Sequence, residues 1–143
     1  MLGRILLTID GILLLFGAPI ADYSHTHMLN PNWPPHAKFH NGQTIILSLL
    51  LGLATLFYTW RPAASSPALR REFRLASAFA GSIYWLAGLC AILFPGTMGL
   101  DPEFGGPGFP QAPLFALAAV CALLGSWLDA PPAAAAAVKT KGN

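Results

Sequence analysis

Polar residues are scarce in four stretches of the chain and are concentrated in the segments between them. The apolar stretches cover residues 2–20, 42–58, 75–94 and 113–128. Each is close to the ~20 residues with which a helix crosses ~30 Å of hydrocarbon. Because an unpaired backbone group is costly in lipid, such stretches are expected to be helical. With their flanks included, we predict transmembrane helices at about 2–20, 35–59, 74–94 and 112–128.

The composition favours a membrane protein over a soluble domain. Hydrophobic residues make up 55% of the 143 residues and charged residues 10%, whereas soluble domains have about 25% charged residues. We therefore predict one all-α domain, a four-helix transmembrane bundle over residues 1–129, with a disordered Pro/Ala-rich tail over residues 130–143. Such a multi-pass protein is surrounded by membrane lipid, and its few crossings leave room for a homo-oligomer.

The first apolar stretch has one alternative interpretation. Arg4 precedes an apolar core, as it would in a secretory signal peptide. However, Asp10 interrupts that core, and residues 18–21 offer no good pair of small residues for cleavage. We expect an uncleaved helix.

The basic residues are distributed unevenly over the two sides of such a bundle. With four crossings, the N-terminus, the middle connection and the tail share one side. Their bases are Arg4, Arg61, Arg70, Arg71, Arg74, Lys139 and Lys141, and the opposite side has only Lys38. Because short basic segments remain in the cytoplasm, both termini are predicted to be cytoplasmic. The net charge of +2, without a basic stripe, gives no support for a nucleic-acid partner.

The opposite side, outer or lumenal, then carries the residues best suited to chemistry. The segment from residue 22 to residue 43 contributes the candidate site residues Asp22, His25, His27, His36, His40 and Gln43. Pro34 and Pro35 suit the first turn of a helix. A helix beginning there would place His36, His40 and Gln43 on one face. His25 and His27 would share one side of an extended segment.

Two kinds of chemistry and one structural alternative fit this segment. Imidazoles transfer protons near neutral pH, and Asp22, Asp101 or Glu103 could orient one of them. The candidate metal ligands are His25, His27, His36 and His40. Their spacing matches no zinc signature, so a divalent metal is not favoured and the cofactors stay unknown. In the structural alternative, the histidines and tryptophan only anchor the protein at the lipid headgroups.

Asp10 is a second candidate site residue, near the middle of the first apolar stretch. An ionised carboxylate at that depth costs several kcal/mol, so it should face the bundle interior. We expect Ser82 or Tyr84 to donate a hydrogen bond to it. The equally weighted alternative is a protonated carboxyl with a structural role. Gly81 and Gly88 would let helices approach closely.

The glycine-rich run over residues 104–110 is not a phosphate-binding loop. It lacks the Lys-Ser/Thr pair that such loops require. The run could form a lid over the histidine segment, but a plain linker is the preferred interpretation.

The histidine segment resembles a motif of a known but uncharacterised family. Its letters from His27 to Gln43 fit the pattern HxxNPxWPPHAKFHxGQ. This pattern is similar to that of a family of small, four-helix integral membrane proteins. The resemblance implies the fold and the place of a site, and it implies no reaction. Size and layout are also similar to those of small membrane enzymes such as anthrone oxidases, without a shared motif.

Three functions fit these expectations. The first is a membrane enzyme acting on a lipophilic small molecule by isomerisation, hydration or oxidation, although the sequence leaves open whether the protein is an enzyme at all. The second is a non-catalytic membrane subunit or a carrier of a ligand or metal. The third is a proton-coupled transporter that uses Asp10.

Overall fold

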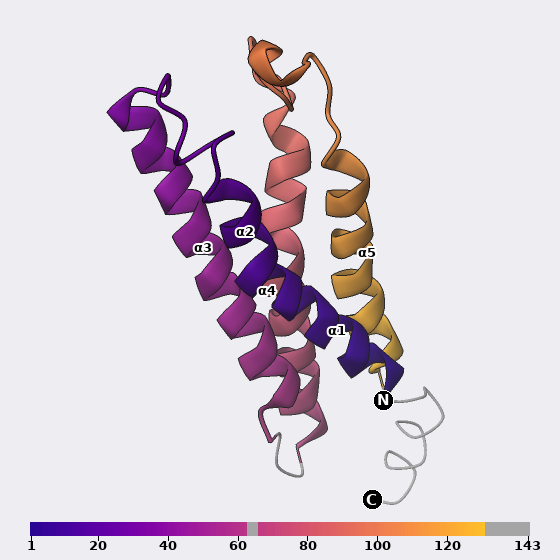
Figure 1. Cartoon of the computed structure of the whole chain (residues 1–143). Coiled ribbons are helices and arrows are strands. Elements are labelled where there is room, and N and C mark those ends of the chain that lie inside the picture. Colours follow the sequence, from indigo (N-terminus) through magenta and orange to yellow (C-terminus); the bar gives the residue numbers. More distant parts are fainter. Residues whose placement is uncertain (63–65, 131–143) are drawn as a thin grey trace, which may run out of the picture.

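The computed structural model describes residues 1–62 and 66–130, which form a bundle of four helical segments without a strand (Figure 1). The first segment is continuous and comprises α1 (Leu2–Ile12), the π-helical turn η1 (Leu13–Gly17) and α2 (Ala18–Asp22). The others are α3 (Pro35–Trp60), α4 (Pro67–Ala91) and α5 (Ala112–Leu128). A short 3-10 turn, η2 (Pro102–Phe104), lies between α4 and α5. The all-α prediction is confirmed, while the predicted tail lies beyond the described residues except for Ala130.

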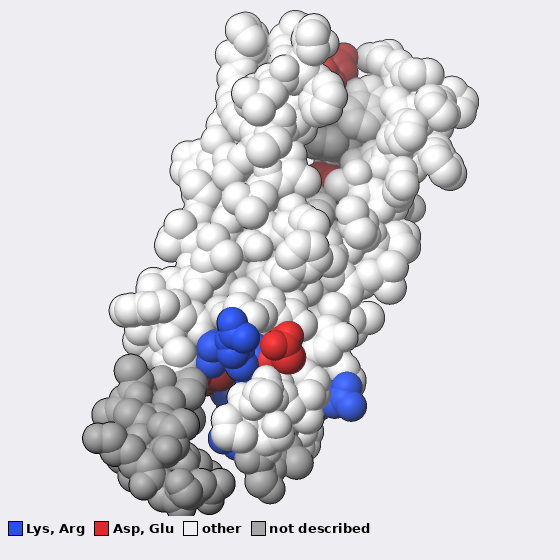
Figure 2. Space-filling view, turned by 180° about the vertical axis from the view of Figure 1, so that it is seen from behind, with Lys and Arg blue, Asp and Glu red and all other residues white. Residues whose placement is uncertain are grey.

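Successive helical segments run in opposite directions. The first loop (residues 23–34) and the second loop (residues 92–111) therefore lie at one end of the bundle, called here the loop end (Figure 1). The N-terminus, the α3–α4 connection and the end of α5 lie at the other end. We call this the arginine end, because the basic side chains visible in Figure 2 gather there. The predicted grouping of the two loops is thus present in the fold.

Three helical segments are long and apolar enough to cross a membrane. They are Leu2–Asp22, Pro35–Trp60 and Pro67–Ala91, whereas α5 is a shorter apolar helix of 17 residues. Large apolar side chains such as Leu50, Phe79 and Leu117 are exposed on the outside of the bundle. The lengths and the apolar outer surface are those of a protein surrounded by lipid. Whether α5 also crosses a membrane stays a prediction.

α4 begins earlier than the apolar pattern predicts. The expected start is Arg74, but the helix begins at Pro67 and ends at Ala91 rather than Phe94. The Ser66 side chain caps this start by accepting a hydrogen bond from the backbone N–H of Leu69 at 3.3 Å. The first turns of the helix are therefore polar, which a search for apolar residues cannot find.

Close helix contacts and buried hydroxyl groups hold the bundle together. A Cβ atom on Gly52 of α3 would lie 2.9 Å from the carbonyl oxygen of Gly11 in α1. Ser48 of α3 donates to the carbonyl oxygen of Leu14 in the π-helical turn at 2.6 Å. Small residues and buried hydroxyls are typical of helix contacts inside membranes. These contacts join the first helical segment to α3 along its length.

Candidate functional site

A cavity of about 740 Å³ opens at the loop end between α3, α4 and α5. α2 packs on α3 at this end, and residues of α4, α5 and the second loop form the other walls of the cavity. The surface hollow near the top of Figure 2 lies at this end of the bundle. We call this space the loop-end cavity.

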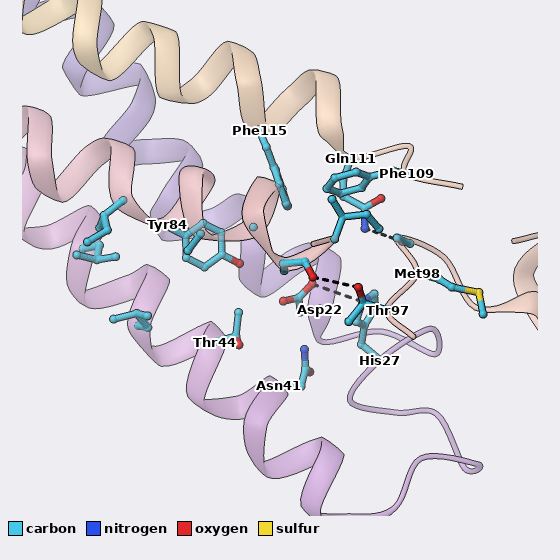
Figure 3. A pocket seen from close by; sticks show the side chains of 18 of the residues that line it. Asp22, His27, Asn41, Thr44, Tyr84, Thr97, Met98, Phe109, Gln111 and Phe115 are labelled. Carbon is cyan, nitrogen blue, oxygen red and sulfur yellow. Dashed lines mark hydrogen bonds and ion pairs between the residues drawn. The ribbon is translucent and has the colours of Figure 1, made fainter. Parts of the chain in front are cut away.

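The loop-end cavity has an apolar body and a polar end. Its apolar lining includes Leu47, Leu51, Phe79, Ile83, Met98, Phe109 and Phe115. Its polar lining consists of Asp22, His27, Asn41, Thr44, Tyr84, Thr97 and Gln111. In Figure 3 the side chains of Asp22, Tyr84, Thr44 and Asn41 surround the same space. A cavity of this size and lining suits a small apolar molecule that carries a few polar groups.

Asp22 and His27 form a carboxylate–imidazole pair at the polar end (Figure 3). His27 Nε2 lies 4.0 Å from Asp22 Oδ1, and the Asp22 side chain is only 17% exposed. Asp22 is the last residue of α2, and the first loop then turns back: the backbone N–H of Met28 donates to the Asp22 carbonyl oxygen at 3.1 Å. This turn brings the imidazole over the carboxylate.

A chain of hydrogen bonds fixes which nitrogen of His27 carries its proton. Ser24 Oγ donates to the carbonyl oxygen of Ala21 at 2.7 Å. Thr26 Oγ1 lies 2.9 Å from Ser24 Oγ and 2.7 Å from His27 Nδ1. Each hydroxyl has one proton, so Thr26 donates to Ser24 and must accept from Nδ1–H of His27. In the neutral ring the Nε2 lone pair then faces Asp22, and the pair can hold a further proton.

Two other polar groups of the cavity have an unsatisfied acceptor. Asn41 Oδ1 and Gln111 Oε1 are buried and have no hydrogen-bond partner within residues 1–62 and 66–130. The other end of the Gln111 amide is fixed, because Nε2 donates to the Gly99 carbonyl oxygen at 2.6 Å. Leaving a buried acceptor unpaired costs about 1–3 kcal/mol. Both acceptors therefore favour a ligand that donates hydrogen bonds.

The two acids of the second loop join the loops and do not contact a histidine. Glu103 accepts from Asn30 Nδ2 at 2.7 Å and from Asn32 Nδ2 at 3.0 Å. Asp101 Oδ2 accepts from Trp33 Nε1 at 3.4 Å. Our expectation that one of these acids orients an imidazole is therefore not met directly. Asp101 is connected to His27 only through Trp33, whose ring packs edge-on against the imidazole with ring centroids 5.3 Å apart.

The second loop also covers part of the cavity. Met98, Gly99 and Phe109 of this loop line the cavity wall. The glycines permit this close packing, because a Cβ atom on Gly99 would overlap the backbone of Phe109. The loop is thus more than the plain linker that we preferred from its composition.

His36, His40 and Gln43 share one face of α3 but do not line the cavity. His40 Nε2 lies 3.0 Å from His36 Nε2, and His40 Nδ1 lies 3.3 Å from Gln43 Oε1. All three side chains are exposed. His25 is also exposed and lies outside the cavity lining. The loop-end cavity therefore contains only one of the four histidines.

The histidines do not gather into a metal site. In the described part of the chain, no group of three or more His, Cys, Asp or Glu side chains is arranged to hold a metal ion. His36 and His40 supply two neighbouring nitrogens, and His27 faces Asp22 on another segment. We therefore assign no reaction step to a metal.

Asp10 lies inside the bundle, as expected, but its partner differs from the expected one. Its side chain is fully buried, and Trp85 Nε1 donates to Oδ1 at 2.8 Å. Oδ2 has no partner among the described residues and occupies a notch that Gly81 leaves open, which a Cβ atom would fill. Ser82 and Tyr84, the expected donors, do not bond to Asp10. Tyr84 points into the loop-end cavity instead. Asp10 does not line that cavity.

Sequence reasoning missed Asn41, Thr44, Tyr84 and Gln111 as cavity residues. A usable signal was present in α3, where the polar residues at 41, 44, 48, 55 and 59 recur at helical spacing. In an apolar helix, such a polar stripe marks the side that faces the protein interior. Gln111 had no comparable signal, because its position depends on the path of the second loop.

The fold and the cavity define a small helical bundle with apolar helices of the kind found in membrane proteins and a polar-ended cavity at one end. The chain belongs to a family of unknown function (DUF6640), whose model matches residues 6–134. This match covers the first helical segment from residue 6 onward, the other three helical segments and every residue that lines the loop-end cavity. Neither the curated proteins nor the solved structures contain a match to the chain.

Proposed function

We propose that this protein is a multi-pass membrane enzyme whose loop-end cavity binds a lipophilic small molecule with a polar end. His27, paired with Asp22, transfers a proton on that molecule. The observation that carries the proposal is the placement of this pair, at 4.0 Å, in the polar end of an apolar cavity. Both chain ends face the cytoplasm, and the cavity lies at the outer or lumenal side.

The uneven charge supports this orientation. Of the six basic residues that the structure describes, five lie at the arginine end, while the loop end has Lys38. Basic segments next to membrane helices remain in the cytoplasm. A ligand dissolved in the outer leaflet would then enter the cavity from the membrane, with its polar group at headgroup level.

The geometry supports proton transfer with His27 as general base. Nε2 of the neutral ring has its lone pair directed toward Asp22, so it can take a proton from the bound molecule. The Asp22 carboxylate stabilises the imidazolium that forms. Nε2–H then returns the proton to another atom of the same molecule, which makes the net reaction an isomerisation. In a hydration, Nε2 instead takes the proton from a water molecule that adds to the ligand, and Nε2–H delivers that proton to the neighbouring atom of the adduct.

The other polar residues support binding of the ligand's polar end. The unpaired acceptors of Asn41 and Gln111 can each receive a hydrogen bond from a hydroxyl or amine group. Tyr84 provides a hydroxyl on the facing wall. These groups would fix the reacting atoms beside His27, which is the main requirement for efficient proton transfer.

A carrier is the second candidate function, and the mainly apolar lining of the cavity favours it. Binding needs the cavity and the acceptors but not the carboxylate–imidazole pair. The transporter hypothesis has less support, because the one buried carboxylate in the middle of the bundle, Asp10, is separate from the cavity lining.

The experiment compares wild-type protein with His27→Gln and Asp22→Asn in detergent. Each is incubated with the apolar extract of cells that produce the protein, and the products are analysed by mass spectrometry. Binding is measured in parallel by photolabelling with a diazirine-bearing hexadecanol. The proposal expects a product with wild type only, while all three proteins are labelled. Equal labelling without any product from wild type would contradict an enzyme and favour a carrier.

A further inference from the structure

A second, smaller cavity lies at the arginine end of the bundle, opposite the proposed active site. It has a volume of about 140 Å³ and is formed by the start of α1, the ends of α3 and α5 and the start of α4. The basic residues that line it are Arg4, Arg61, Arg70 and Arg74. Tyr58, Thr59 and Asp129 contribute its other polar groups. We call this space the arginine-end cavity.

Aromatic rings hold two of these arginines in place. The Arg61 guanidinium carbon lies 5.1 Å from the centre of the Phe57 ring and 4.9 Å from that of the Phe73 ring. The Arg4 guanidinium carbon lies 5.9 Å from the Trp60 ring. Stacking on a ring face leaves the N–H groups at the edge of a guanidinium able to donate hydrogen bonds. The donors are therefore oriented before any ligand binds.

The positive charge of this cavity exceeds its negative charge. Asp129 is the single acid in the lining, and its Oδ1 lies 3.5 Å from Arg4 Nε. Within residues 1–62 and 66–130, no carboxylate lies within ion-pairing distance of Arg61 or Arg74. Glu72 instead pairs with Arg71, which is outside the cavity, at 3.9 Å. The charges of Arg61 and Arg74 are therefore not balanced by a carboxylate of the described residues, which favours a ligand with more than one negative oxygen.

We propose that the arginine-end cavity binds a phosphate group, namely the headgroup phosphate of an anionic phospholipid. Arginine donates in the forked geometry that matches phosphate oxygens. The cavity lies at the ends of the three helical segments that are long enough to cross a membrane, and the exposed Trp60 ring lies against Arg4 in its lining. Basic pockets between membrane helices on the cytoplasmic side are typical sites for anionic headgroups. This site is independent of the proposed reaction, since its residues belong to the other end of the bundle.

The test measures lipid binding to the full chain in a neutral detergent by native mass spectrometry. The probes are short-chain phosphatidic acid, phosphatidylcholine of the same chain length and inorganic phosphate. The test variant is Arg61→Gln/Arg74→Gln. The matched control is Arg71→Gln, which removes a neighbouring arginine of α4 that does not line the cavity. We expect wild type to bind one phosphatidic acid much more tightly than phosphatidylcholine.

The expected loss in the double variant is at least about tenfold in affinity, because two guanidinium groups that donate charge-assisted hydrogen bonds are removed. Arg71→Gln should change the affinity less than about twofold. If the double variant does not fold, the salt dependence of wild type decides, since binding at an exposed basic site must weaken between about 0.05 M and 0.5 M salt.

Four results would overturn the proposal. The first is equal binding of phosphatidic acid and phosphatidylcholine, and the second is an equal loss in Arg71→Gln and the double variant. The third is displacement of phosphatidic acid by an equal concentration of inorganic phosphate, which would assign the site to a free anion. Salt-independent binding by wild type would also contradict it.

Discussion

The histidine pair on α3 and the single histidine His27 of the first loop differ sharply in their surroundings. His36 and His40 lie 3.0 Å apart on the exposed side of α3 and do not line the loop-end cavity. His27 lies 4.0 Å from a mostly buried carboxylate and lines a cavity of about 740 Å³. Helical spacing predicted that His36 and His40 would meet, whereas the position of His27 beside Asp22 depends on how the first loop folds. Spacing along a helix therefore identifies side chains that contact one another. The packing of the bundle determines which of them line a cavity and can contact a ligand.

The largest expected effect comes from removing each histidine in turn. His27→Gln should lower conversion of the ligand at least about 100-fold, because general acid–base groups typically contribute 10²–10⁴-fold. His40→Gln should leave conversion within about twofold, since His40 does not line the cavity. Product formation by both variants is measured in the same extract. An equal loss in both variants would contradict the separate role of His27.

Filling the cavity should have the next largest effect. Ala87 lines the loop-end cavity, while its neighbour Leu86 is exposed on the outside of the bundle. Ala87→Phe should therefore reduce saturable photolabelling by the hexadecanol probe about tenfold, which corresponds to about 1.4 kcal/mol of binding free energy. Leu86→Phe is the control and should label like wild type. Undiminished labelling of Ala87→Phe would mean that the probe binds elsewhere.

Loosening the two loops should destabilise the cavity wall to a smaller extent. Glu103→Gln weakens the hydrogen bonds from Asn30 and Asn32. Since these bonds are charge-assisted and partly exposed, we expect a loss of about 1–2 kcal/mol in the free energy of unfolding. Glu72→Gln removes only the exposed pair with Arg71 and should cost less than about 0.5 kcal/mol. Unfolding in detergent compares the two, and equal costs would show that the loops are not joined through Glu103.

The smallest effect is expected for the exposed histidine pair on α3. His36→Gln/His40→Gln should change the free energy of unfolding by less than about 0.5 kcal/mol, as is usual for exposed positions. The same unfolding measurement applies. A cost of several kcal/mol would indicate that this face of α3 is covered in the membrane, for example by a second copy of the chain.

The sequence was sufficient to predict the helical class and the position of the two loops at the same end of the bundle. The length of the apolar stretches indicates helices that could cross a membrane. The shared face of His36 and His40 follows from helical spacing alone, and the burial of Asp10 inside the bundle follows from the cost of placing a charge in lipid. Both are present in the structure.

The rest depends on tertiary packing. The partner of Asp10 is Trp85 because Gly81 leaves space for the carboxylate beside that part of α4, and no spacing rule could select Trp85 over Tyr84. Gln111 lines the loop-end cavity because the second loop returns there to the start of α5.

The central claim is that ligands bind in the loop-end cavity beside His27, and photolabelling followed by peptide mapping tests it most directly. Wild-type protein is labelled with the diazirine-bearing hexadecanol, with and without excess unlabelled hexadecanol, and the modified residues are identified by mass spectrometry. We expect saturable labelling on the cavity walls, at residues 79–92 of α4 and 109–115 at the start of α5. Saturable labelling confined to the exposed face with His36 and His40, or labelling that excess hexadecanol does not reduce, would contradict the claim.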